Sequence, residues 1–179
     1  MAMDHFLEEV VIKRNTVINR IIYYLSWILI VLFAVYAALI FGTLTTNFQW
    51  FSVIQIVIFG GSAVLLYLYH DRLLTEYEYT FTNGSLDFAE VYNNKKRKTL
   101  GSLNVKTVDA FGKVSSGSFN RYVNMPGIKK MNWFLNRDAE LYYFYFSKDS
   151  AKKMIILEPS EEMVENIKIY LPYGAYQVN

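Results

Sequence analysis

Two long apolar runs dominate the pattern of hydrophobic and polar positions along the chain. They cover residues 21–41 and 50–69, and neither contains a charged side chain. At 1.5 Å per helical residue, each run is long enough to cross the roughly 30 Å hydrocarbon core of a bilayer. Only a short polar stretch separates them, so the pattern predicts a two-helix transmembrane hairpin over residues 21–69.

The residues before the first run have an amphipathic pattern. Apolar side chains recur at a helical spacing, and charged side chains fall mostly on the other face. This pattern predicts an amphipathic N-terminal helix over residues 1–20. Such a helix would lie on the membrane surface, pack on the soluble part of the chain, or extend the first transmembrane helix.

Basic residues near the two runs predict the orientation of the hairpin. Lys13, Arg14 and Arg20 precede the first run and Arg72 follows the second, whereas the turn between the runs has no Lys or Arg. Lys and Arg are enriched on the cytoplasmic side of transmembrane helices. We therefore expect a multi-pass protein of the plasma membrane with both termini in the cytoplasm.

Small and polar residues inside the runs predict how the two helices pack. Ala34, Ala38 and Gly42 recur every four residues, a spacing that lets helix backbones approach closely. We expect this row to face the second helix, with a seam between two copies of the chain as the alternative. Gln55 is polar and Tyr36 lies at a matching depth, so a hydrogen bond between them is expected.

Beyond the second run, the pattern changes to the alternation of half-buried β-strands. Residues 76–82 alternate strictly, and the Asn83-Gly84 pair predicts a tight turn into a second strand at 85–92. Asn93-Asn94 predicts another turn. Further short strands are expected between residues 100 and 111, at 141–146 and at 153–157.

The end of the chain predicts one amphipathic helix. Ser160 can cap its first turn, acidic residues follow where the helix dipole favours them, and Pro172 ends it. Residues 174–179 are then expected to form a loosely held tail.

Together these elements predict an α+β soluble domain, mainly antiparallel β, over residues 75–173. Strands followed by a single closing helix resemble a pleckstrin-homology-like domain, which implies a bent sheet or partly open barrel of about seven strands. The whole chain resembles uncharacterised bacterial membrane proteins that carry such a domain on the cytoplasmic side, after two N-terminal spans. The resemblance rests on the paired runs, residues 76–84, the basic run 95–98 and Leu157-Glu158-Pro159.

Composition excludes several classes of activity. The chain has no cysteine, so disulfides, thiolate catalysis and cysteine-ligated zinc are excluded. The two histidines, His5 and His70, lie on opposite flanks of the hairpin, and we expect no metal site and no cofactor. From residue 70 onward, 15 Lys and Arg stand against 13 Asp and Glu, so no nucleic-acid partner is expected. Glu76 and Glu78 fit a solvated strand face better than a catalytic pair, and we expect no enzyme.

Two basic segments are candidate binding sites. Lys95, Lys96, Arg97 and Lys98 form either a solvated edge or a contact with anionic lipid head groups, and the predicted strand directions place them near the inner leaflet. Residues 112–138 follow no regular pattern, with a strand around 119–125 as one option. Within them, basic and aromatic residues interleave as either a packed loop or a partner surface: Arg121, Tyr122, Lys129, Lys130, Trp133 and Phe134.

The function expected from these features is binding rather than catalysis. The first hypothesis is a membrane-anchored binding or scaffold protein that presents its domain to lipid or to a membrane protein partner at the cytoplasmic face. The alternative is a structural subunit of a larger membrane complex. The bilayer is the expected partner in both, and a homodimer is a further option.

Overall fold

The computed structural model describes residues 5–178, which form two compact units. The helical unit contains residues 15–75 and the turn at 92–95. The sheet unit contains the described residues before 15 and the segments 76–91 and 96–178.

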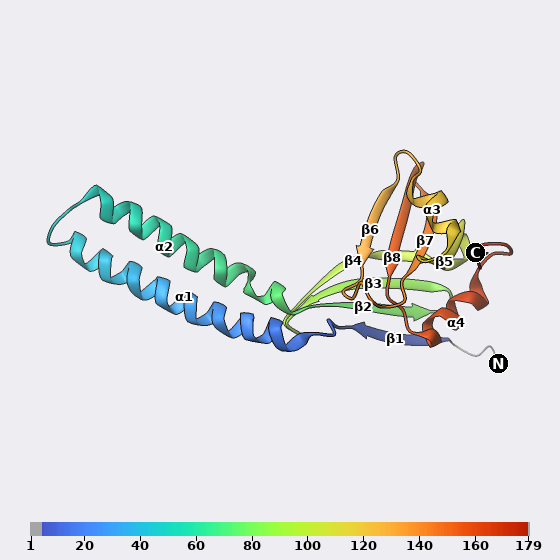
Figure 1. The fold of residues 1–179 in the computed structure, drawn as a ribbon, viewed down its shortest axis with the longest axis horizontal. Helices are drawn as coiled ribbons and strands as arrows, with labels where there is room; N and C mark the ends of the chain where they lie inside the picture. Colours follow the sequence, from blue (N-terminus) through green and yellow to red (C-terminus); the bar gives the residue numbers. More distant parts are fainter. Residues whose placement is uncertain (1–4, 179) are drawn as a thin grey trace. The chain divides into compact units, whose positions relative to one another are not determined.

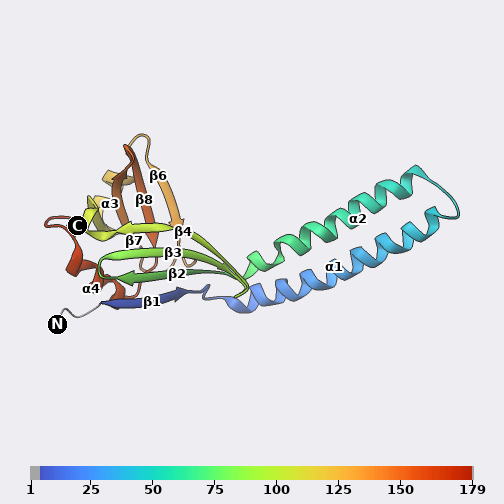
Figure 2. The same ribbon diagram turned by 180° about the vertical axis from the view of Figure 1, so that it is seen from behind.

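The helical unit is an antiparallel pair of long helices (Figures 1 and 2). Helix α1 covers Thr16–Leu44, α2 covers Trp50–Tyr69, and the 3-10 helix η1 covers His70–Leu74. The predicted pair of apolar helices is confirmed, although α1 begins before residue 21. Both helices are long and apolar enough to cross a membrane.

The contact between α1 and α2 uses a different row of small residues from the predicted one. Ala34, Ala38 and Gly42 are exposed, so the predicted packing of this row on the second helix is wrong. Ala37 is buried instead, and a Cβ atom built on Gly60 would lie 3.9 Å from the Cβ of Ala37. Successive helix positions differ by about 100°, so Ala37 faces α2 while its neighbour Ala38 points away.

A polar pair lies between the same two helices. Gln55 Nε2 donates a hydrogen bond to the Tyr36 hydroxyl at 3.3 Å, as the sequence predicted. The ring of Phe59 packs against Tyr36 at 4.6 Å and against Phe33 at 5.5 Å between ring centroids. The hydrogen bond gives the Gln55 amide a partner in a surrounding that is otherwise apolar.

The sheet unit begins with a four-stranded sheet in the order β1-β2-β3-β4. Its first two predicted strands and the turn between them are confirmed. Asn83 and Gly84 both have positive φ, as a two-residue hairpin turn requires. The strands are β1 (Phe6–Val11), β2 (Thr75–Thr82), β3 (Ser85–Tyr92) and β4 (Lys96–Asn104).

Strand β1 corrects the prediction of an N-terminal amphipathic helix. Residues 6–11 pair antiparallel with β2, with Val11 opposite Tyr77, while residues 1–4 lie outside the described part. Leu7 and Val11 face the core from alternate positions of the strand. A short apolar segment fits the spacing of a helix as well as that of a strand. Pairing with β2 makes this segment a strand, because the pairing satisfies its backbone hydrogen-bonding groups.

The second sheet has five strands in the order β6-β8-β7-β5-β9. The β6–β8 and β5–β9 pairs are parallel, and the β5–β7 and β7–β8 pairs are antiparallel. The described strands therefore form two sheets and no closed barrel. The strands are β5 (Ala110–Lys113), β6 (Lys129–Trp133), β7 (Tyr142–Lys148), β8 (Ala151–Leu157) and β9 (Tyr176–Gln177).

Two segments of this sheet region differ from the prediction. Helix α3 (Gly117–Val123) replaces the optional strand, because Phe119 and Tyr122, three residues apart, both pack against Tyr143 of β7. The expected loose tail instead forms β9, which pairs with β5.

Two helices complete the unit, the 3-10 helix η2 (Val105–Thr107) and the predicted last helix, α4 (Glu161–Tyr170). The Ser160 hydroxyl caps α4 by accepting a hydrogen bond from Met163 N at 3.1 Å.

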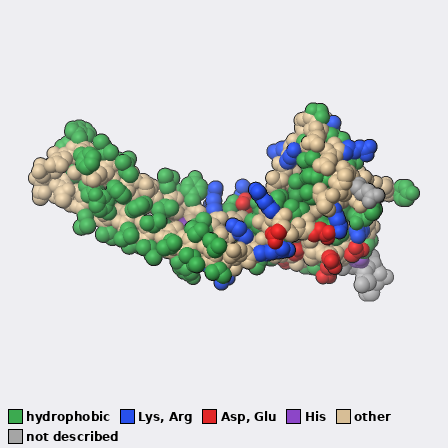
Figure 3. Space-filling model, viewed as in Figure 1, with side chains coloured by type: hydrophobic (Ala, Val, Ile, Leu, Met, Phe, Trp, Pro, Cys, Tyr) green, Lys and Arg blue, Asp and Glu red, His purple; other side chains and the backbone are tan. Residues whose placement is uncertain are grey.

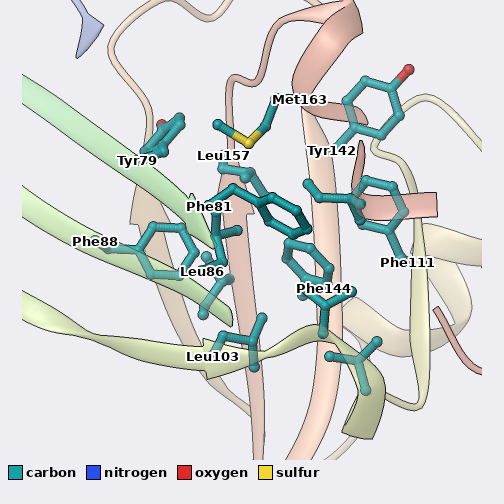
Figure 4. Close-up of a cluster of buried hydrophobic side chains, with 14 of the residues drawn as sticks. Tyr79, Phe81, Leu86, Phe88, Leu103, Phe111, Tyr142, Phe144, Leu157 and Met163 are labelled. Carbon is teal, nitrogen blue, oxygen red and sulfur yellow. The ribbon is translucent and has the colours of Figure 1, made fainter. Parts of the chain in front are cut away.

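Two hydrophobic cores hold the sheet unit together. The larger core lies between the two sheets and α4, and Figure 4 shows Phe81, Phe88, Phe144 and Met163 converging within it. The smaller core lies on the other face of the five-stranded sheet, where Tyr143 and Tyr145 pack against α3. Both faces of that sheet are therefore covered, which explains the aromatic run in β7.

Candidate functional site

The predicted basic run lies at the start of β4, and three of its four cations have acidic partners. Lys95 Nζ lies 3.6 Å from Asp71 Oδ1 in the helical unit. In the sheet unit, Arg97 pairs with Glu78 at 2.8 Å and Lys98 pairs with Glu90 at 3.8 Å. Among the described residues, Lys96 is the member of the run without an ion pair. The positive charge offered to an external anion is therefore smaller than the sequence suggested.

The turn between β3 and β4 is fixed to η1 by its first asparagine. Asn93 N donates to Leu74 O at 2.8 Å, and Asn93 Nδ2 donates to Asp71 Oδ1 at 2.7 Å. The same amide nitrogen lies 3.1 Å from the Tyr23 hydroxyl of α1. Asn93 and Asn94 both have positive φ, which confirms the predicted turn. Sequence reasoning recognised the turn but did not identify its partner Asp71.

His70 occupies the centre of an aromatic cluster at the same end of the helices. Its ring is buried between Tyr23, Trp27 and Tyr67, at centroid distances of 5.3, 4.9 and 5.7 Å. Nδ1 lies 2.6 Å from the Tyr67 carbonyl oxygen, which can only accept, so Nδ1 carries a proton. Nε2 lies 3.5 Å from Asp71 Oδ1. His70 is therefore a packed member of the aromatic cluster, and its Nε2 has no hydrogen-bond partner among the described residues.

The structure separates the second predicted surface into a half-buried aromatic part and an exposed basic part. Trp133 packs on Phe88 at 4.6 Å in the larger core, Tyr122 stacks on Tyr145 at 4.6 Å, and Phe134 joins the smaller core. The aromatic members therefore support the fold. The basic members Arg121, Lys129 and Lys130 are exposed.

Strand pairing brings further cations beside this exposed part. Lys129 of β6 lies directly opposite Lys153 of β8, and Lys148 and Lys152 flank the turn from β7 to β8. These three β7–β8 lysines are distant from residues 121–130 in the sequence, so only the sheet register shows that the groups are neighbours. The local sequence contains no signal for this.

At the other end of the same strands, a hydrogen-bonded network surrounds Asn136. Its Nδ2 donates to Ile12 O at 2.9 Å and to Glu158 Oε1 at 2.8 Å, and its Oδ1 accepts from Arg14 N at 2.8 Å. The network ties the end of β1 to the segment before α4. A polar cavity of about 430 Å³ adjoins it and is lined in part by Glu9.

Glu9 is the perturbed acid of this cavity. Burial raises the pKa of its carboxyl above 4.5, and the nearby charges of Glu158 and Glu162 act in the same direction. A hydrogen bond from Ser160 N to Glu9 Oε2, at 3.0 Å, opposes them. Among the described residues, no group of three or more His, Asp or Glu side chains is arranged to hold a metal ion.

Comparison with known proteins supplies a family but no individual relative. Neither a curated protein nor a solved structure matches the sequence. A family model described as a bacterial PH-like domain, DUF6106, matches residues 3–177. This match spans nearly the whole chain, including the two apolar helices, β1 and β9. The chain therefore belongs to the bacterial PH-like domain family DUF6106.

Proposed function

We propose that this protein is a membrane-anchored binding or scaffold module that presents its PH-like domain at the cytoplasmic face. The observation that carries the proposal is the exposure of α1 and α2. Their apolar side chains point outward around the pair, as with Leu39 at 67%, Val57 at 68% and Leu68 at 63% exposure (Figure 3). A soluble protein rarely exposes so large an apolar surface to water, whereas the hydrocarbon core of a bilayer accommodates such a surface.

The aromatic residues at the two ends of the helices support the same proposal. Trp27 and Tyr67 contact each other at one end, with a centroid distance of 6.1 Å, and Phe48 contacts Trp50 at the other at 5.3 Å. Trp and Tyr are enriched at both interfaces of a bilayer. The 20 residues of α2 span about 30 Å, which matches the hydrocarbon thickness between such interfaces.

The proposed role of the domain is binding, and its orientation follows from the distribution of basic residues. Lys13, Arg14, Arg20 and Arg72 lie beside one end of the helix pair, and the turn at residues 45–49 has no charge. That turn crosses the membrane at lower cost than the charged end. Both termini and the sheet unit are then cytoplasmic.

Cysteine labelling tests this proposal, because the native chain has no cysteine. In intact cells, Thr45→Cys should react with a membrane-impermeant maleimide, and Ser147→Cys should react only after permeabilisation. Carbonate extraction should leave both variants in the membrane fraction. Labelling of Ser147→Cys alone in intact cells would reverse the topology, and release by carbonate would contradict the anchor itself.

A further inference from the structure

One end of the five-stranded sheet carries a concentration of cations. We define this basic end by Lys129 and Lys130 on β6 and by Lys148 and Lys152, which flank the β7–β8 turn. All four side chains belong to exposed residues. Asp149 is the acid in the turn itself, and it lies 3.9 Å from the neighbouring Lys153.

The four cations of the basic end differ from most other cations of the sheet unit in their pairing. Arg14, Arg97, Lys98, Lys113 and Lys168 each have a carboxylate partner. Within the described part of the chain, none of the four basic-end residues forms an ion pair. Apart from the Lys153–Asp149 pair, the cations at this end of the sheet are therefore left without an acidic partner in the described part of the chain.

Protection of a sheet edge explains only part of this concentration. β6 is an edge strand, and lysines on an edge discourage pairing with another strand. However, β7 and β8 are interior strands of the sheet, so Lys148 and Lys152 protect no edge. Lys129 is also the register partner of Lys153 in the parallel β6–β8 pair, so two cations lie on neighbouring strands there.

The opposite end of β8 carries a complementary set of acids. We define this acidic end by Glu158, Glu161 and Glu162, together with Glu9, which accepts a hydrogen bond from Ser160 N. None of the four forms an ion pair among the described residues, and Glu158 and Glu162 help raise the pKa of Glu9. The seven residues of β8 separate the two ends by about 20 Å.

We propose that the basic end of one sheet unit docks on the acidic end of a second copy of this chain, so that copies associate head to tail. The two surfaces lie at opposite ends of one rigid strand, so they cannot neutralise each other within one copy. Two unlike surfaces generate a heterologous contact, which continues from copy to copy.

The lack of exposed apolar surface at the basic end favours an electrostatic partner. Among the described residues, the large apolar side chains exposed on the sheet unit lie on or beside β1, at Ile169 and toward the C-terminus, and none lies between 76 and 168. Protein interfaces usually have an apolar centre, so this contact is weak in solution. Confinement in a bilayer, which rests on the function proposed above, raises the effective concentration of the copies.

A charge-exchange experiment tests the contact in the full chain. The chain is reconstituted into neutral phosphatidylcholine vesicles, and energy transfer is measured between donor and acceptor dyes on Thr45→Cys. The basic-end variant carries Lys129→Glu, Lys130→Glu and Lys152→Glu, and the acidic-end variant carries Glu161→Lys and Glu162→Lys. The matched control is Lys96→Glu with Lys106→Glu, two exposed lysines that lie outside both ends. Circular dichroism and vesicle flotation check folding and insertion of every variant.

The parent and the control should transfer energy above the level of random proximity, and about 1 M NaCl, which screens within about 3 Å, should abolish the excess. Each reversed variant alone should fall to the random level, and an equimolar mixture of the two should regain the excess because their ends are complementary again. Failure of flotation would contradict the membrane anchor. Two results would overturn the head-to-tail contact. The first is normal flotation of the parent with energy transfer at the random level, and the second is no recovery of energy transfer in the mixture of the two variants. Either result counts against the contact even if the basic end binds added anionic vesicles.

Discussion

At the residue scale, Tyr79 shows how a buried polar atom joins two elements of the sheet unit. Its side chain is fully buried, its hydroxyl donates to Trp133 O, and the hydroxyl accepts from Glu158 N at 3.3 Å. Burial raises the pKa of this hydroxyl far above its ordinary value, so Tyr79 stays neutral. The hydroxyl thereby connects β2 to the end of β6 and to the segment before α4.

Tyr79→Phe should destabilise the protein by about 2 kcal/mol, because it removes two hydrogen bonds made by a fully buried side chain. Thermal unfolding of the full chain in a mild detergent measures the change. The control is Tyr77→Phe on the same strand, whose hydroxyl forms no hydrogen bond with the described residues. Equal stability of the two variants would show that the Tyr79 hydroxyl is not a structural link.

Glu9 gives the protein a predictable dependence of stability on pH. Its pKa in the folded state is raised, mainly by burial, above the ordinary 4.5. A carboxyl with a raised folded pKa contributes stability below its unfolded pKa, and this contribution is lost as pH rises through the folded pKa. The charged form that predominates at neutral pH is therefore the less favourable one in the folded protein.

Glu9→Gln should match the parent in acid below pH 4.5 and be more stable at neutral pH. The amide oxygen still accepts from Ser160 N, and the partly buried charge is removed. Melting temperatures measured from acid to neutral pH check this, with Glu8→Gln on the exposed face of β1 as the control. A Glu9→Gln variant that is less stable than the parent at pH 7 would contradict the assigned cause.

At the element scale, the packing of α1 on α2 depends on which of two neighbouring alanines of α1 faces α2. Ala37 faces Gly60 of α2, whereas Ala38 is exposed. Ala37→Leu should force the helices apart and lower the melting temperature in detergent, because small residues allow the close approach. Ala38→Leu should leave the melting temperature nearly unchanged. Greater damage from Ala38→Leu would reverse the assignment of the contact face.

The turn between β3 and β4 should be held on η1 by the Asn93 side chain. Asn93→Gly keeps the positive φ and the bond from N to Leu74 O, and it removes the bond to Asp71. Hydrogen exchange at residues 92–95 should become faster by several-fold, consistent with the loss of about 1 kcal/mol. The control is Asn94→Gly, one residue along the same turn, which should leave hydrogen exchange at Asn93 nearly unchanged. If both variants accelerate exchange equally, the geometry of the turn, and not the Asn93 side chain, controls the exchange rate.

At the scale of the whole molecule, β1 makes the sheet unit depend on both ends of the chain. β1 precedes the helices in sequence and pairs with β2, which follows them. A fragment that starts at residue 75 would lack the edge strand of the four-stranded sheet. Tests of lipid binding therefore require the full chain.

The basic run gives a test at this scale. In nanodiscs at low salt, hydrogen exchange at residues 92–98 should be slower with anionic lipid than with neutral lipid. Each cation near such a surface contributes up to about 1 kcal/mol, and the acidic partners of Lys95, Arg97 and Lys98 reduce this. Replacing residues 95–98 with serine should remove the difference between lipids. A difference that persists in the serine variant would locate the lipid contact elsewhere.

The sequence by itself determined the features that depend on local physical chemistry. The two apolar helices follow from run length and the absence of charge, and the turns at Asn83-Gly84 and Asn93-Asn94 follow from residues that tolerate positive φ. Ser160 was identified as a cap because its hydroxyl can reach a backbone amide three residues away. The Tyr36–Gln55 bond was also predictable, since antiparallel helices of known length fix the depth of each residue.

Only the tertiary structure decided the features that depend on partners distant in the sequence. Residues 6–11 became a strand because β2 was available to pair with them, and the last residues became β9 because β5 offered a free edge. The acids that neutralise most of the basic run, and the lysines that join Lys129 and Lys130, come from other elements. Periodicity records which face of a segment is apolar, but it contains no information about which segment covers that face or which charge lies beside it.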